Sequence, residues 1–240
     1  MKTKILFLVI IMTTFTSSSC GGSQHKEESR KPLDFSTVWT SYQDDVLGYV
    51  GENYQRFYFL IDSVKPDIKD TLLYCVWGKY RIKDRISFFE GLAHVVKYSE
   101  LSKEYGVRED SPLSGIQTYS LITEWDLKAK EDNEKINGRM TSTFYMVNGD
   151  AVFDDLDIGY CDSYCNNQFE GILSSSTYGK QKCRWGTFRI PDSEGLDIGA
   201  GEFSPHEKYL ANGWQSYHDA FVEGTEEGWN KEKQSHWTLQ

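Results

Sequence analysis

The sequence predicts an all-β domain: an antiparallel up-and-down meander of about eight strands that closes into a barrel, followed by a short C-terminal helix. Three observations lead to this prediction. Apolar runs of strand length alternate with turn signals from residue 55 to residue 190. Aromatic residues make up 15% of the chain, and Tyr is the most abundant of them, which is typical of half-exposed strands. An octet containing Cys, Trp, Gly, Arg and Ile occurs twice, which indicates two related halves.

The first residues read as a signal peptide. Lys2 and Lys4 precede an apolar run at residues 5–12, as in the charged and apolar regions of secretory signals. Eight helical residues rise about 12 Å, whereas a bilayer core is about 30 Å thick, so this run is too short to span a membrane. We therefore expect residues 1–19 to be removed.

The end of this segment, Ser17-Ser-Ser-Cys20 followed by two glycines, resembles the lipobox of Bacteroidota-type lipoproteins. The usual Leu three positions before the Cys is replaced here by Ser17. The resemblance implies that Cys20 is diacylated and that the chain is an outer membrane lipoprotein, with the membrane as a partner through the lipid anchor. The alternative is ordinary secretory cleavage near Ser19, which would leave Cys20 as a free thiol.

A short acidic signal follows the lipobox. Lys26-Glu27-Glu28 resembles the export signal that sends such lipoproteins to the cell surface, and so implies surface display. The alternative is that residues 20–34 are only a solvated, flexible tether, which their polar composition with Gly and Ser also fits.

The charge balance argues against nucleic acid as a partner. The full chain has 26 basic and 36 acidic residues. Cleavage before Cys20 removes Lys2 and Lys4 and no acid, which changes the formal charge from −10 to −12. Because the chain has no basic run, neither nucleic acid nor anionic lipid headgroups are expected partners.

The barrel domain is expected to span residues 35–222, beginning with an irregular lead-in at residues 33–54. Asn148-Gly149 lies between apolar runs and is a strong hairpin signal, and Asn137-Gly138 is expected to close a charged tip at residues 128–135. The expected strands are residues 55–61, 71–82, 86–98, 116–125, 140–147, 151–156, 168–173 and 184–190.

The C-terminal part predicts one short helix and a tail. Ser204-Pro-His-Glu207 has the pattern of a capping box with Pro at the first helical position, and Gly213 fits a C-cap. These signals predict a helix at residues 205–212. Residues 223–240 are polar and are expected to fray.

The repeated octet is Cys75-Val-Trp-Gly-Lys-Tyr-Arg-Ile82 and Cys183-Arg-Trp-Gly-Thr-Phe-Arg-Ile190. One interpretation is a duplicated element in a barrel with two related halves. The alternative is that Gly recurs next to large rings in any β-meander because it relieves crowding.

Four cysteines remain besides Cys20, and an exported chain with an even number of them favours disulfides. We expect Cys183 to bond to Cys161 or Cys165, with Cys75 as the rival partner and free thiols as the remaining alternative. Only Cys161 and Cys165 are close in sequence, so a tetrathiol zinc site is disfavoured.

Part of the sequence resembles an uncharacterised β-rich lipoprotein family. The string consists of Asn166-Asn-Gln-Phe-Glu-Gly171, Cys183-Arg-Trp-Gly186, Arg189-Ile-Pro191 and residues 196–203, and the resemblance covers roughly residues 115–214. It implies no activity. The rhythm of strand, turn and Gly is also similar to barrels of the lipocalin or avidin type, although a fold does not determine function.

Candidate ligand-binding residues are the rings Trp77, Trp125 and Trp185, together with Glu170, which lies in an expected strand. Core packing is the alternative role for the three rings. The acidic, Gly-rich stretch offers Asp192, Glu194, Asp197 and Glu202 as weak candidates for a cation such as Ca²⁺, the alternative being a structural loop. No cofactor is expected, and no catalytic motif is present.

These features favour a membrane-anchored, non-enzymatic binding or interaction module whose ligand is a small molecule, a glycan or a protein. One alternative is an inhibitor or immunity protein whose acidic face blocks a basic envelope enzyme. Another is a hydrolase that uses paired carboxylates as acid and base.

Overall fold

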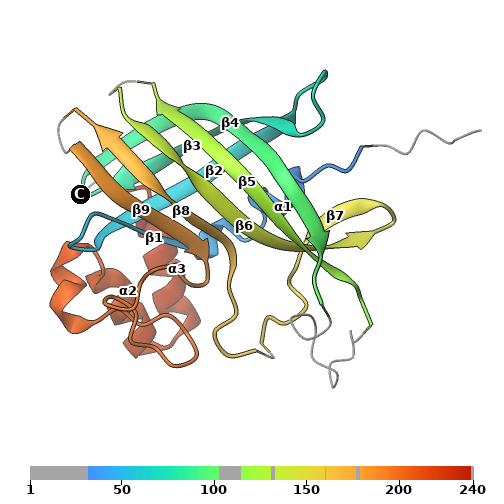
Figure 1. Ribbon diagram of the computed structural model, residues 1–240. Coiled ribbons are helices and arrows are strands. Elements are labelled where there is room, and N and C mark those ends of the chain that lie inside the picture. Colours follow the sequence, from blue (N-terminus) through green and yellow to red (C-terminus); the bar gives the residue numbers. More distant parts are fainter. Residues whose placement is uncertain (1–31, 103–114, 131–132, 160, 177–178, 239–240) are drawn as a thin grey trace, which may run out of the picture. The chain divides into compact units, whose positions relative to one another are not determined.

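The computed structural model describes residues 32–102, 115–130, 133–159, 161–176 and 179–238. Nine strands form one antiparallel sheet, and eight of them close into a barrel (Figure 1). The all-β barrel prediction is therefore confirmed. The strands are β1 (Val46–Val50), β2 (Gln55–Pro66), β3 (Leu73–Ile82), β4 (Arg85–Glu100), β5 (Thr118–Ala129), β6 (Lys135–Val147), β7 (Asp150–Phe153), β8 (Asn166–Ser175) and β9 (Gly179–Thr187).

The chain runs up and down the barrel with one detour. Strand β5 pairs with β6, β6 with β8, β8 with β9, and β9 with β1, which closes the ring. Strand β7 pairs with the end of β6 and lies outside the ring order. Its hairpin turn is the expected one: Asn148 and Gly149 have φ of 53° and 88°, as a tight β-hairpin turn requires.

Two local expectations were wrong. Residues 46–50, expected in an irregular lead-in, form β1, which is buried on both faces and so lacks the alternation that marks most strands. Asn137-Gly138 lies inside β6 and forms no turn. A Cβ at Gly138 would lie 2.5 Å from the Cα of Gly171 in β8, so this Gly permits close strand packing.

Aromatic side chains fill the barrel interior. The ring of Trp185 stacks on Phe169 with centroids 3.5 Å apart and on Phe59 at 4.1 Å, and Phe59 stacks on Phe89 at 5.1 Å. All four rings are at most 3% exposed. They come from β2, β4, β8 and β9, so one cluster ties both halves of the sheet together.

The repeated octets are not equivalent in the barrel. Trp185 belongs to the interior cluster, whereas Trp77 is half-buried on the outer face, with Lys65 Nζ 5.8 Å from its ring. The structure instead supports crowding as the reason for the recurring Gly. A Cβ at Gly78 would lie 2.5 Å from the ring of Phe89, and one at Gly171 would lie 2.5 Å from Phe169.

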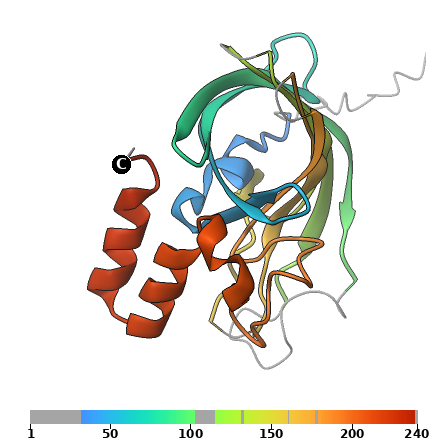
Figure 2. The ribbon, with the colours of Figure 1, turned by 90° about the vertical axis from the view of Figure 1, so that its left-hand side faces the viewer.

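A short helix occupies one end of the barrel. Helix α1 (Ser36–Thr40) lies within the ring of strands (Figure 2) and contributes Val38 and Trp39 to the interior cluster. Trp39 meets Tyr74 and Trp125 edge to face, with centroids 4.9 and 5.5 Å apart. The 3₁₀ helix η1 (Gln43–Asp45) then leads into β1.

The C-terminal segment packs on the outside of the barrel. Leu47 and Tyr49 on the outer face of β1 form a second cluster with residues that include Leu196, Phe203 and Trp214. This cover explains why β1 is buried on both faces. The expected helix at residues 205–212 is the 3₁₀ helix η2 (Glu207–Asn212), which has His206 as its N-cap and Gly213, at φ 94°, as its C-cap.

The described part of the expected tail, residues 223–238, is not frayed. Helix α2 (Gln215–Glu223) is followed by α3 (Glu226–Ser235), and both lie outside the ring of strands (Figure 2). Glu232 of α3 is buried and forms an ion pair with Arg56 of β2 at 2.7 Å, and His236 Nε2 lies 2.7 Å from the same carboxylate. Because a buried charge needs a partner, this pair fixes α3 to the barrel.

Candidate ligand-binding site

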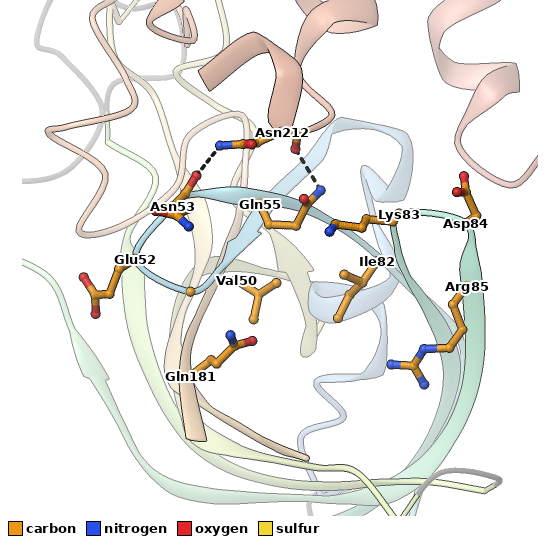
Figure 3. A pocket seen from close by; sticks show the side chains of 11 residues that line it. Val50, Glu52, Asn53, Gln55, Ile82, Lys83, Asp84, Arg85, Gln181 and Asn212 are labelled. Carbon is orange, nitrogen blue, oxygen red and sulfur yellow. Dashed lines mark hydrogen bonds between the residues drawn. The ribbon is translucent and has the colours of Figure 1, made fainter. Parts of the chain in front are cut away.

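The two ends of the barrel differ. Helix α1 occupies the end where Tyr74 lies, at the start of β3. At the opposite end, the β1–β2 and β3–β4 turns surround a cavity of about 500 Å³, which we call the mouth (Figure 3). A cavity of this size is within the range of small-molecule sites.

Four strands direct side chains into the mouth. Figure 3 shows Val50, Ile82, Arg85 and Gln181 reaching toward the cavity from different sides. They come from β1, β3, β4 and β9, and they are inward positions because alternate residues of a strand face the same side. The cavity wall therefore combines two apolar side chains, Val50 and Ile82, with two long polar ones, Arg85 and Gln181.

Carboxamide groups organise the rim of the mouth. Gln55 Nε2 donates to the Asn212 carbonyl at 2.8 Å, and Asn212 Nδ2 donates to the Asn53 carbonyl at 2.7 Å (Figure 3). These bonds hold the end of η2 over the β1–β2 turn. The Gln55 and Asn53 side chains thus lie in a rim whose position is fixed by hydrogen bonds.

A buried acid anchors the cationic side chain of the mouth. Arg85 Nη2 lies 2.8 Å from both carboxylate oxygens of Glu134, which is 3% exposed. The hydroxyl of Tyr80 also donates to Glu134. Burial, together with the bond to Glu134 and its charge, raises the pKa of Tyr80 well above its usual range, so the phenol stays neutral and keeps donating. This network orients Arg85 and fixes one wall of the cavity.

The remaining lining is charged and comes from turns. Lys83 has φ of 54° in the β3–β4 turn beside Asp84, and Glu52 lies in the β1–β2 turn. The mouth thus offers amide, ammonium and carboxylate groups for hydrogen bonding and lacks an aromatic wall among its lining residues. Such a lining fits a hydrophilic ligand better than a lipid-like one.

The ligand-binding residues expected from the sequence lie elsewhere. Trp125 and Trp185 are each 2% exposed and belong to the interior core, where the Trp125 indole donates to Thr123 Oγ1 at 2.7 Å. Trp77 is on the outer face, as is Glu170, which is exposed and 3.8 Å from Arg184 Nε. The core role that was the alternative for the rings therefore holds for two of the three.

The acidic, Gly-rich stretch is a structural loop. Asp197 pairs with Arg189 Nη2 at 2.6 Å and accepts backbone N–H bonds from Gly199 and Ser204, and Asp192 pairs with Arg184 at 3.3 Å. The other candidates are exposed. Within the part of the chain that the structure describes, no group of three or more His, Cys, Asp or Glu side chains could hold a metal ion.

The expected disulfides of Cys183 are not formed, and all four cysteines of the described chain are free thiols. Cys165 precedes Asn166, which pairs with Thr187. Thr187 lies four residues along β9 from Cys183, or about 13 Å at 3.3 Å per residue, whereas bonded cysteines have Cα atoms within about 7 Å.

The other two partners are also excluded by position. Cys161 is exposed in the loop before β8, whereas Cys183 is fully buried inside the barrel. Cys75 in β3 is separated from β9 by β2 and β1, which corresponds to roughly 14 Å at about 4.8 Å per strand.

Sequence reasoning missed the mouth because its residues are ordinary turn and strand-end residues. Asn53 falls in the expected irregular lead-in, Lys83-Asp84 in the short turn between two expected strands, and Gln181 just before an expected strand. Only the closure of the sheet brings these three segments to one opening. The polar inward positions Arg85 and Gln181 break the apolar alternation, and that is the one signal the sequence carried.

Comparisons with protein-family models, with curated proteins and with solved structures found no match for this chain. The candidate site therefore depends on its own geometry and chemistry. The barrel fold is compatible with non-enzymatic binding. Cys20 and the Lys26-Glu27-Glu28 signal lie outside the described residues, and no helix in the described ranges is both long and apolar enough to cross a membrane.

Proposed function

We propose that this chain is an outer membrane lipoprotein, tethered by a diacylated Cys20, whose barrel binds a small hydrophilic ligand at its mouth. The observation that carries the binding part is the cavity of about 500 Å³ at the end of the barrel opposite α1. Its side chains are mostly polar, and several are held in place by hydrogen bonds. The lipobox-like segment at residues 17–22 supports the tether.

The ligand class follows from the lining. Gln55, Gln181, Asn53 and Asn212 present amide groups, and Lys83 adds an ammonium donor. Groups of this kind bind molecules with several hydroxyl or carbonyl groups, because each donor or acceptor removed from water needs a partner. A saccharide or a similarly polar small molecule is therefore the expected ligand.

The binding part can be tested on the compact unit that begins at residue 32. Its binding to a glycan array and to a panel of polar metabolites would be compared with that of Gln181→Trp, which fills the mouth. Lys180→Trp is the matched control, since Lys180 is the exposed neighbour of Gln181 in β9. We expect ligands that bind the parent and Lys180→Trp and lose binding to Gln181→Trp; equal binding by all three would contradict the proposal.

The tether is tested separately. Mass spectrometry of protein extracted from membranes should show a diacylglyceryl adduct on Cys20, and Cys20→Ala should release soluble protein. If Cys20→Ala fractionates with membranes as the parent does, the lipoprotein assignment is wrong. Accessibility to protease on intact cells then decides whether the barrel is displayed on the surface.

A further inference from the structure

A second cavity lies on the side of the barrel that the C-terminal helices cover. It is a groove of about 720 Å³ between the helices α2 and α3 and the loops that follow β7 and β9. We call it the helix-side groove. It shares no lining residue with the mouth, and the residues lining it fulfil no role in the proposed mouth function.

Two pairs of aromatic rings line the helix-side groove. On the helix side, Tyr217 of α2 and Trp229 of α3 meet edge to face with centroids 5.0 Å apart. On the loop side, Tyr164 and Phe188 meet edge to face at 5.6 Å. All four rings are partly exposed. Rings on both walls of a cavity offer the negative faces that attract organic cations.

The cationic side chains of the groove are already paired. Lys233 Nζ lies 2.7 Å from Asp45 Oδ1, and Arg189 pairs with Asp197 at 2.6 Å. His236 contacts Glu232, whose carboxylate also pairs with Arg56. Each of these basic side chains therefore lies against a carboxylate of the protein itself.

Four acids of the groove have no such partner. Among the described residues, Asp44, Asp162, Glu202 and Glu226 line the groove, are exposed, and form no ion pair with any basic side chain. They come from η1, the loop before β8, the loop after β9, and α3. The groove therefore combines aromatic walls with an uncompensated negative charge at its edges.

We propose that the helix-side groove binds an organic cation, an alkylammonium or guanidinium group seated between the two ring pairs with the four carboxylates around it. The ring faces favour a cation that is large and weakly hydrated. The carboxylates raise its local concentration and select against anions. A free amine and a Lys or Arg side chain of a basic polypeptide present the same chemistry, and the test separates the two sources.

The test measures binding to the full chain, purified in detergent, by isothermal titration calorimetry and by Trp fluorescence. The probes are tetramethylammonium, spermidine and a tri-arginine peptide, with acetate as the anionic control. We expect saturable binding of at least one cation, weaker at high salt, and none of acetate. Preference for tetramethylammonium or spermidine indicates a free amine, and preference for tri-arginine indicates a basic polypeptide.

Variants then assign the binding to the groove. Glu226→Gln combined with Asp162→Asn should weaken binding about tenfold, because both acids are exposed and their loss leaves the fold intact. Glu227→Gln is the matched control, since Glu227 is the exposed neighbour of Glu226 in α3 and does not line the groove. Trp229→Leu should weaken binding by a similar factor, and Trp229→Phe should largely retain it.

Several outcomes would overturn the inference. They are no saturable binding of any cation, equal loss in Glu227→Gln and in the double variant, or unchanged binding in Trp229→Leu with its helix content intact by circular dichroism. The mouth variant Gln181→Trp should bind the cations as the parent does. The experiments therefore distinguish failure of the cation-binding proposal from failure of the proposal that the mouth binds a ligand.

Discussion

The closed barrel determines the reactivity of Cys183, whose side chain faces the interior. Cys183 lies between Val50 of β1 and Gly171 of β8 and is fully buried. Burial raises the pKa of its thiol far above the usual range. Since only the thiolate reacts with alkylating reagents, this cysteine should be inert in the folded protein.

This protection is measurable by alkylation of the reduced, native protein with iodoacetamide. Cys161 is exposed and should be labelled readily, and Cys165 should be labelled more slowly because burial raises the pKa of its thiol. Cys183 should be labelled only after unfolding. Peptide mapping by mass spectrometry distinguishes the three sites. Labelling of Cys183 at a rate like that of Cys161 would show that the interior is open to solvent.

The two tryptophans of the repeated octet provide a second test at the residue scale. Trp185 is sandwiched between Phe59 and Phe169, whereas Trp77 is half-buried on the outer face. Trp185→Ala should lower the free energy of unfolding by about 3–5 kcal/mol, as removal of large core rings does. Trp77→Ala, its matched control, should cost clearly less, and equal losses in urea denaturation would contradict the assigned orientation.

At the scale of the element, α3 is held by one buried group of charges. Burial by itself would raise the pKa of Glu232, but the hydrogen bond from His236 and the charge of Arg56 outweigh it and lower this pKa to about 2. The carboxyl is therefore easier to ionise in the folded protein than in the unfolded chain. Its stabilising effect is present above its unfolded pKa, near 4.5, and is lost as the pH falls toward 2.

The free energy of unfolding should therefore fall between about pH 4.5 and pH 2, with Glu232 contributing up to about 3 kcal/mol of that loss. Glu232→Gln removes the titrating group and should flatten this part of the profile while lowering stability at pH 7, because Arg56 would lose its buried partner. Glu227→Gln, an exposed change on the same helix, should leave the profile unchanged. Parallel profiles for the parent and Glu232→Gln would exclude this role.

At the scale of the whole molecule, the two apolar clusters meet at β1. Val50 belongs to the barrel interior, and Leu47 and Tyr49 belong to the cluster under η2. Because β1 contributes side chains to both clusters, unfolding of β1 would remove contacts from both of them. Their stabilities are therefore linked. The barrel and its C-terminal helices should consequently behave as one cooperative unit.

Thermal unfolding can test this cooperativity. Far-UV and near-UV circular dichroism of the chain from residue 32 should report a single transition with one midpoint, and the native spectrum should be dominated by strand. Two separated transitions, with the helical signal lost first, would mean that α2 and α3 dock as an independent unit.

The fold class could be predicted from the sequence alone. Strand-length apolar runs and turn signals such as Asn148-Gly149 are local properties, and they suffice for a meander because each strand pairs mainly with its sequence neighbour. The glycines beside large rings were also interpretable, since the Phe-Gly contacts at Gly78 and Gly171 limit the space for a Cβ. By contrast, the polar composition of residues 223–240 did not predict α3, which is held by contacts with residues distant in sequence, including the ion pair between Glu232 and Arg56.

Which residues come together in a site could not be predicted from the sequence. Trp77 and Trp185 share the local pattern Cys-x-Trp-Gly. Their opposite orientations follow from strand register, because a shift of one residue exchanges the two faces of a strand. The mouth gathers Asn53, Arg85 and Gln181 from turns and strand ends that meet only when β9 pairs with β1. Strand and turn preferences depend on neighbouring residues, so they can be recognised in the sequence. The cavity forms only when the sheet closes into a barrel, and this depends on pairing between strands far apart in the sequence.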